Sequence, residues 1–157
     1  MSLFITFQHI VPQHLLSRGV GRLAASENTF VKNTFIKNFA AKYQVNMAEA
    51  LEENPLAYKS FNDFFTRALK PNARPIASDS KAIISPADGA ISQIGAITAD
   101  KIFQAKGHDY SVTTLLGGNE QRAAAFVGGQ FATVYLSPKD YHRVHMPFMG
   151  KLTQMIY

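Results

Sequence analysis

Two histidines three residues apart, His142 and His145, are the first residues of this sequence whose types and spacing suggest chemistry. They lie in the stretch LSPKDYHRVHMP, between Pro138 and Pro147. Prolines this close together leave too little chain for a stable helix, so the pair is expected on a loop or at a strand end. Imidazole titrates near neutral pH and can act as a general acid or base. The spacing alone leaves open a pair of structural, hydrogen-bonded histidines.

Asp88 is the carboxylate that could work with such a histidine. It lies in Pro-Ala-Asp-Gly, a turn signal with β-branched residues on both sides. A carboxylate fixed by a turn can hold one imidazole tautomer, although an ordinary turn aspartate fits the pattern too. A Ser-His-Asp hydrolase would need a nucleophile as well. The internal candidates are Ser85, Ser92, Ser111 and Ser137, but none of them lies in a Gly-x-Ser-x-Gly elbow. No serine of the chain directly follows a glycine either.

Several other chemistries have little support. The chain has no cysteine, which excludes disulfides, thiolate nucleophiles and cysteine-ligated metal. His-x-x-His without a third ligand nearby is weak evidence for zinc, so no metal site is expected. Lys106 and His108, beside a glycine, could grip a carboxylate or phosphate or could lie on a solvated loop. Aromatic and basic residues do not interleave on a strand, so no nucleic-acid partner is expected.

Most of the positive charge lies near the N-terminus. Residues 1–42 hold five basic groups and one acidic group, while the whole chain has a net charge of +5. Polar residues interrupt the apolar run before the ~20 residues that a membrane span needs, and the arginines follow it, unlike in a secretory signal. Two short amphipathic helices are expected instead. The second, residues 29–42, has a phenylalanine-rich face that could lie in a bilayer interface or pack on the protein's own core.

Further helices are expected before the strands. Residues 47–51 are predicted to form a short helix that ends at Asn54-Pro55. Ser60 is a predicted N-cap, with Asp63 as its capping partner. The helix that follows is expected to point four residues inward: Phe61, Phe64, Phe65 and Leu69.

From residue 81 the pattern changes to short strands and turns. Strands are expected on both sides of the Asp88 turn, over residues 128–136 and from residue 150 onwards, and Ser111 is expected to cap a short helix closed by Gly117-Gly118. The fold class is therefore α+β: amphipathic helices at residues 1–76, then a mostly antiparallel β-rich domain at residues 77–157. A terminal strand without obvious partners predicts a domain truncated before its C-terminal part.

Four stretches of this sequence resemble the N-terminal, β-chain part of bacterial phosphatidylserine decarboxylases. They are YKSFNDFFTRALKPNARPI, SPADGAISQIG, QAKGHDYSVTTLLGG and FATVYLSPKDYHRVHMPFMGKL. The resemblance implies a pyruvoyl-dependent lyase of phospholipid biosynthesis that converts phosphatidylserine to phosphatidylethanolamine and CO2. It also implies a peripheral location at the cytoplasmic face of the cell membrane. In this family a serine in a Leu-Gly-Ser-Thr motif cleaves the zymogen autocatalytically and becomes the pyruvoyl group, which serves as the electron sink.

The resemblance assigns roles to three residues. Asp88 and His145 match the aspartate and histidine of the self-cleavage triad, and His142 matches a histidine that assists decarboxylation. The N-terminal helices match a region that docks on anionic membrane. The implied partners are phosphatidylserine, an α-chain that carries the pyruvoyl group and a second copy in a homodimer. Because the Gly-Ser cleavage site is absent here, the chain alone is predicted to be inactive, and an inactive membrane-binding remnant is the alternative.

Overall fold

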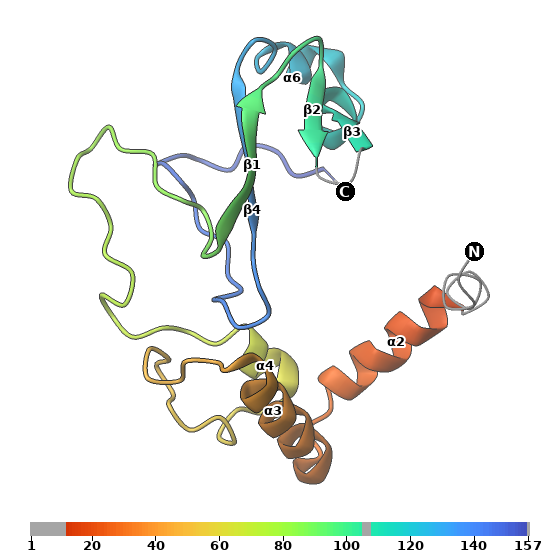
Figure 1. The fold of residues 1–157 in the computed structure, drawn as a ribbon, viewed down its shortest axis with the longest axis vertical. Coiled ribbons are helices and arrows are strands. Elements are labelled where there is room, and N and C mark those ends of the chain that lie inside the picture. Colours follow the sequence, from red (N-terminus) through yellow and green to blue (C-terminus); the bar gives the residue numbers. More distant parts are fainter. Residues whose placement is uncertain (1–11, 105–107, 157) are drawn as a thin grey trace. The chain divides into compact units, whose positions relative to one another are not determined.

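The computed structural model describes residues 12–156 except residues 105–107. The chain forms two compact units, residues 1–75 and residues 76–157. Helices α2 (Gln13–Ala24), α3 (Thr29–Tyr43) and α4 (Phe61–Phe65) belong to the first unit, and antiparallel strands belong to the second (Figure 1). The predicted α+β class, with helices first and antiparallel strands second, is confirmed. Among the described helices, none is long and apolar enough to cross a membrane.

The two basic helices form where the sequence predicts them. Asn28 caps α3, since its side-chain oxygen accepts hydrogen bonds from the backbone N–H groups of Phe30 (3.1 Å) and Val31 (3.2 Å). Gln44 ends α3 in the left-handed conformation. The apolar residues of α3 do not share one environment: Ile36 is fully buried, whereas the side chain of Phe30 is 80% exposed. Ile36 therefore packs on the protein's own core, whereas Phe30 does not.

The first unit is held together by an aromatic core around Ile36, Tyr58 and Phe64. Phe39 of α3 contacts Phe61 of α4 edge-to-face, with ring centroids 5.0 Å apart. The predicted Ser60 cap is confirmed, because its hydroxyl oxygen accepts a hydrogen bond from the Asp63 N–H at 3.2 Å. Helix α4 is shorter than expected and ends before Leu69.

The helix predicted at residues 47–51 is wrong. Ala50 forms an isolated antiparallel bridge with Leu69 instead. Backbone hydrogen bonds join the Leu51 N–H to the Ala68 carbonyl and the Lys70 N–H to the Glu49 carbonyl, both at 2.9 Å. Pairing with the distant segment around Leu69, rather than a helix, therefore satisfies these backbone groups.

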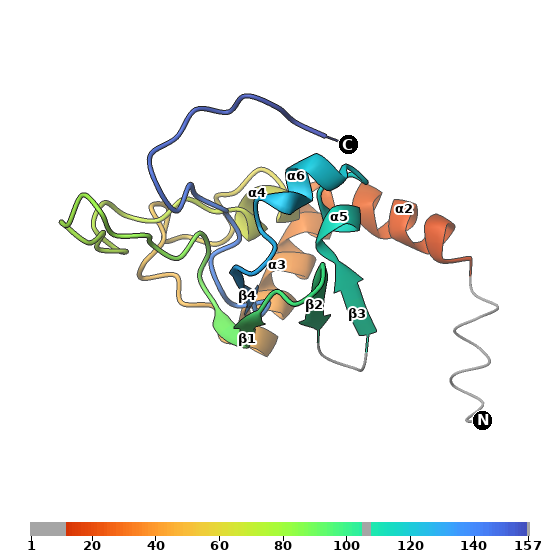
Figure 2. The same ribbon diagram turned by 90° about the horizontal axis from the view of Figure 1, so that it is seen from above.

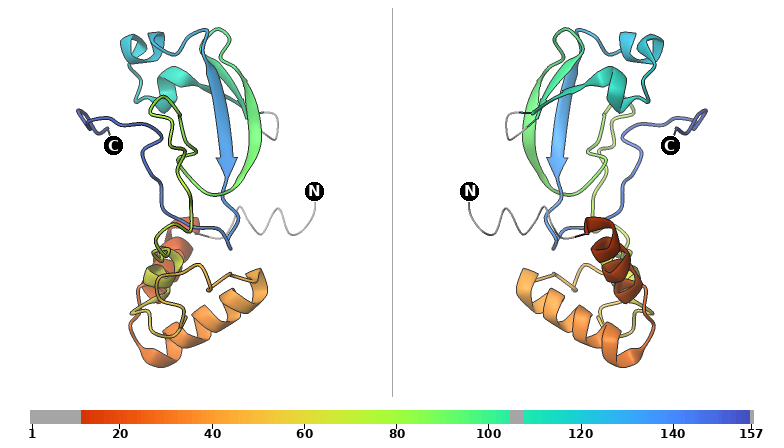
Figure 3. Two further views of the ribbon diagram at one scale, coloured as in Figure 1. Left: turned by 90° about the vertical axis from the view of Figure 1, so that its left-hand side faces the viewer. Right: turned by 90° about the vertical axis from the view of Figure 1, so that its right-hand side faces the viewer.

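In the described part of the second unit there are two antiparallel strand pairs and two short helices. Strand β1 (Ala90–Ala96) pairs with β4 (Gln130–Tyr135), and β2 (Lys101–Gln104) pairs with β3 (His108–Ser111). Figure 3 shows β1 and β4 as a long two-stranded ribbon. Helices α5 (Val112–Leu115) and α6 (Glu120–Ala124) contact each other (Figure 2). Ile97, Val112 and Ala123 form the buried core of this unit.

Asp100 fastens the start of α5 to the loop before β2. Its carboxylate accepts hydrogen bonds from the Ser111 hydroxyl (2.5 Å) and from the backbone N–H and hydroxyl of Thr113 (both 3.0 Å). The bond from Ser111, together with those from Thr113, holds the pKa of the Asp100 carboxyl below its ordinary value. The predicted Ser111 cap is confirmed, since its hydroxyl oxygen also accepts from the Thr114 N–H at 3.3 Å.

Two of the strands expected in the second unit do not form. The described residues before the Asp88 turn and those from residue 150 to residue 156 have no regular secondary structure. Before the turn, the chain makes single backbone bonds to residues 145–147 instead of a continuous ladder. The β2–β3 pair and α6 were not expected, whereas the strand predicted within residues 128–136 is confirmed as β4.

Candidate active site

The antiparallel β1–β4 ribbon gathers the two chemistry-bearing segments at one of its ends. Ala90, the first residue of β1, pairs with Tyr135, the last residue of β4. The Asp88 turn leads into β1, and the loop with both histidines leads out of β4. Since antiparallel neighbours begin and end at opposite ends, these two segments must meet at the same end of the ribbon.

Gly89 lets the Asp88 turn approach β4 closely. It has φ +150°, and a Cβ atom at this position would collide with the carbonyl oxygen of Tyr135. That oxygen is backbone and cannot move aside without disturbing the strand pair. Only glycine fits this approach.

Replacing Gly89 with alanine is expected to destabilise the second unit by about 3 kcal/mol, because the methyl group forces β1 and β4 apart where they first pair. Urea unfolding followed by circular dichroism measures the loss. Gly118→Ala is the control: Gly118 also has a positive φ (+76°), but open space surrounds its Cβ position, so a loss of only about 1 kcal/mol is expected there. Equal losses would show that the contact with Tyr135 is unimportant.

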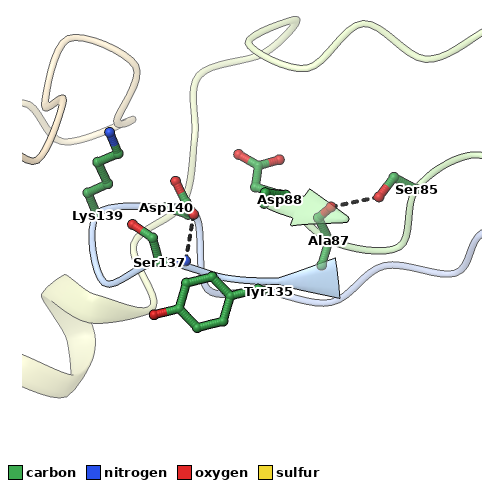
Figure 4. Close-up of a pocket in the computed structure, with 9 residues that line it drawn as sticks. Ser85, Ala87, Asp88, Tyr135, Ser137, Lys139 and Asp140 are labelled. Atoms are coloured by element: carbon green, nitrogen blue, oxygen red, sulfur yellow. Dashed lines mark hydrogen bonds between the residues drawn. The ribbon is translucent and has the colours of Figure 1, made fainter. Parts of the chain in front are cut away.

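A cavity of about 520 Å³ lies beside Asp88. In Figure 4, Asp88 projects from the turn, and Ser137, Lys139 and Asp140 come from the loop after β4. The Asp140 carboxylate accepts a hydrogen bond from the Ser137 N–H at 2.7 Å, and the Asp140 N–H donates to the Ser137 carbonyl at 2.9 Å. This closed turn holds the loop in shape where it lines the cavity. The size is in the range of small-molecule sites.

His142 is held by the backbone of the same turn. Its Nδ1 lies 2.9 Å from the carbonyl oxygen of Asp140. A carbonyl oxygen can only accept a hydrogen bond, so Nδ1 must carry the proton. In the neutral ring, Nε2 is then the basic nitrogen. His142 is thus fixed in one tautomer, as a proton-transferring imidazole requires.

His145 is joined to the segment that leads into the Asp88 turn. Its backbone N–H donates to the Pro86 carbonyl at 2.7 Å, and the Ile84 N–H donates to the Pro147 carbonyl at 2.9 Å. This pairing places the backbone of His145 opposite a residue two positions from Asp88. The His145 ring makes a contact of its own, because Nε2 lies 3.0 Å from the Tyr141 hydroxyl.

The predicted site residues therefore come from segments that the structure brings together, although their roles stay predictions. Asp88 lines the cavity, while His142 and His145 follow on the loop that forms its other side and are not among its lining residues. Tyr141 was missed because its contact with His145 joins two loop residues without helical or strand periodicity. Its position within the DYHRVH motif was the available signal.

Three of the four candidate serines donate hydrogen bonds within the fold, and the Lys106–His108 candidate lies wholly or partly outside the described residues. The hydroxyls of Ser85, Ser92 and Ser111 donate to the Ala87 carbonyl (2.7 Å), the Thr133 carbonyl (3.2 Å) and Asp100 (2.5 Å), which disfavours a hydrolase built on them. Lys106 lies outside the described residues, and only the backbone of His108, in β3, is described. Within residues 12–104 and 108–156, no group of three potential ligands could hold a metal ion.

Comparison with known proteins agrees with the resemblance seen in the motifs. The family model described as phosphatidylserine decarboxylase matches residues 61–157, which include the whole candidate site, and a second model, described as PSD, matches residues 3–44. The chain belongs to the phosphatidylserine decarboxylase family. Membership in this family, predicted from four motifs, is thereby confirmed.

Curated members of the phosphatidylserine decarboxylase family align along nearly the whole chain. Phosphatidylserine decarboxylase proenzymes from Bordetella avium, Hahella chejuensis and Saccharophagus degradans are 58%, 59% and 60% identical over 155 residues. Each alignment covers 99% of this chain but only 53%, 52% and 54% of the relative. The chain thus spans about half the length of the curated relatives it matches.

Proposed function

We propose that this chain supplies the Asp-His part of a self-cleaving phosphatidylserine decarboxylase. Asp88 and His145 serve the self-cleavage, and His142 serves the decarboxylation that follows. The observation that carries the proposal is the backbone bond from His145 to Pro86 at the end of the β1–β4 ribbon. This bond joins the segment that leads into the aspartate turn to the histidine loop, which supports the proposal.

In the self-cleavage step, His145 acts as the base. It takes the proton of a serine hydroxyl, whose oxygen attacks the carbonyl of the preceding peptide bond, so that the peptide C–N bond breaks and an ester forms. Elimination from this ester would release the upstream chain as a carboxylate, and water would convert the remaining dehydroalanine to the pyruvoyl group and ammonia. Asp88 orients the imidazole and stabilises the imidazolium that forms, as the carboxylate of a catalytic triad does. No serine of this chain follows a glycine, so the attacking serine belongs to a polypeptide segment with the family's Leu-Gly-Ser-Thr motif.

The pyruvoyl group made in this way supplies a carbonyl that accepts electrons when CO2 leaves the substrate. The residues beside Asp88 fit such a group, because the cavity is large enough for a serine headgroup and its lining presents carboxylate, hydroxyl and ammonium groups. His142 handles the proton at the reacting carbon. Its Nδ1–H bond to Asp140 leaves Nε2 as the nitrogen that takes up and releases this proton.

The proposal is tested by joining this chain, after residue 157, to the remaining C-terminal part of the Hahella chejuensis relative. By the family resemblance, that part is expected to carry the missing serine. The joined protein is expected to split into two chains on a denaturing gel and to release CO2 from phosphatidylserine. A folded joined protein that stays intact would contradict the proposed self-cleavage.

We further propose that α2 docks the protein on anionic membrane, as a peripheral protein at the cytoplasmic face. Its apolar side chains are open to solvent: Leu15 (66% exposed), Leu16 (58%), Val20 (49%) and Leu23 (45%). Arg18 and Arg22 lie on the same helix, which has no acidic residue in its first turn. Burial of leucine in the interface and attraction of arginine to anionic headgroups then act together.

Replacing both arginines of α2 with glutamine is expected to weaken binding to vesicles of phosphatidylserine and phosphatidylcholine about thirtyfold. Each basic group near an anionic surface contributes about 1 kcal/mol, and vesicle sedimentation measures the change. Lys81→Gln with Lys151→Gln is the matched control, since it removes two exposed charges from the second unit. Equal losses in both double variants, or no binding of the original chain, would count against docking through α2. Binding without any activity in the joined protein would favour the inactive remnant.

A further inference from the structure

Tyr141 contacts the proposed base through both its ring and its hydroxyl. The rings of Tyr141 and His145 stack with centroids 5.5 Å apart and planes 17° apart. The Tyr141 hydroxyl lies 3.0 Å from Nε2 of His145. Tyr141 is itself buried, with 8% of its surface exposed, whereas His145 is exposed. The buried Tyr141 side chain therefore supports the more exposed His145 side chain.

The His145 side chain needs such support because its loop has no regular secondary structure. The backbone hydrogen bond to Pro86 fixes the position of the His145 main chain but not the orientation of its ring. Stacking on Tyr141 restricts the ring plane, and the hydroxyl contact restricts which nitrogen faces Tyr141. An imidazole held by two such contacts loses less rotamer freedom when it reacts.

We propose that Tyr141 is a positioning residue that presets the tautomer of His145. A phenol hydroxyl that donates to Nε2 requires an unprotonated Nε2 and leaves the proton on Nδ1. Nε2 is then already the basic nitrogen, and Nδ1–H is available to an orienting carboxylate. When the attacking serine arrives, its hydroxyl takes the place of the phenol on Nε2, while the stacked rings keep the imidazole plane. The catalytic meaning of this arrangement rests on the proposed function, but the arrangement itself does not.

The ring nitrogens of His145 can be observed directly in the 157-residue chain. We expect ¹⁵N chemical shifts, recorded at about pH 8.5 where imidazole is ordinarily neutral, to show Nδ1 protonated and Nε2 unprotonated. Tyr141→Phe keeps the stacked ring and removes only the hydroxyl. It is expected to shift the tautomer ratio of His145 toward Nε2–H by about threefold to tenfold, the range of a net hydrogen bond.

The matched control is Tyr110→Phe, which removes a phenol hydroxyl from β3 in the same unit, where Tyr110 is 44% exposed. It is expected to leave the His145 tautomer unchanged. If the ratio of the two His145 tautomers is unchanged in a folded Tyr141→Phe chain, the proposal is overturned, because groups other than Tyr141 would then set the tautomer. If that variant does not fold, the unaltered chain still decides: a protonated Nε2 would mean that His145 donates to Tyr141, which contradicts the proposal.

This measurement needs neither the C-terminal part nor activity, so its outcome is separate from that of the proposed function. A joined protein that fails to cleave leaves the tautomer result standing. A tautomer that does not respond to Tyr141 leaves the roles of Asp88 and His145 untouched. In the joined protein, Tyr141→Phe is also expected to slow self-cleavage about threefold to tenfold, in proportion to the population of the reactive tautomer.

Discussion

The purified 157-residue chain is expected to release no CO2 from phosphatidylserine above the uncatalysed background. It carries the proposed orienting carboxylate and the proposed base but no serine preceded by glycine, so it is expected not to form the pyruvoyl group on which the family's chemistry depends. Release of ¹⁴CO2 from carboxyl-labelled phosphatidylserine in detergent micelles measures this. The joined protein described above is the positive control.

Turnover by the chain alone would contradict the account, since it would require an electron sink within these 157 residues. A repeat after borohydride treatment identifies the source of any such turnover. Borohydride reduces the imine that a carbonyl group forms with the substrate amine. A loss of activity would therefore point to a carbonyl group, whereas activity that survives would point to a different chemistry.

Asp88→Asn and His145→Gln are each expected to slow self-cleavage of the joined protein about ten-thousandfold. The first removes the charge proposed to stabilise the His145 imidazolium, and the second removes the proposed base. Losses of this order are typical of triad members. The fraction of uncleaved protein on a denaturing gel, followed over time, measures the rate. Asp79→Asn is the matched control, since the Asp79 carboxylate accepts a bond only from the nearby Lys81 N–H (2.9 Å) among the described contacts.

His142→Ala separates the two steps of the proposed mechanism. This variant of the joined protein is expected to cleave at the normal rate but to release CO2 at least about a hundredfold more slowly, the typical contribution of a general acid or base. Loss of cleavage in a folded His142→Ala variant would place His142 in the self-cleavage machinery instead.

The sequence predicts local features of this fold well and distant pairings poorly. The caps at Ser60 and Ser111 and the strand over Gln130–Tyr135 depend on neighbouring residues, and all three are confirmed. The bridge between Ala50 and Leu69 joins segments far apart in the chain. No periodicity within residues 47–51 could reveal it, so a helix was predicted there.

The same difference between local features and distant pairings applies to the candidate site. Asp88, His142 and His145 could be named because the motifs around them resemble those of a known family. Their two segments lie at one end of the β1–β4 ribbon because Ala90 pairs with Tyr135. The support from Tyr141 depends on how a loop without regular structure folds back on itself. Neither contact leaves a pattern that residue spacing can show.

The central claim is that Asp88 and His145 act as one unit on the missing serine, and a double-mutant cycle on self-cleavage of the joined protein tests it most directly. When two residues act as a unit, removing either one abolishes nearly the whole contribution of the pair to the rate. The account predicts that the Asp88→Asn, His145→Gln double variant cleaves about as fast as the slower single variant. A double variant that is slower by the full product of the two single losses would show that the two residues act independently, which contradicts the account.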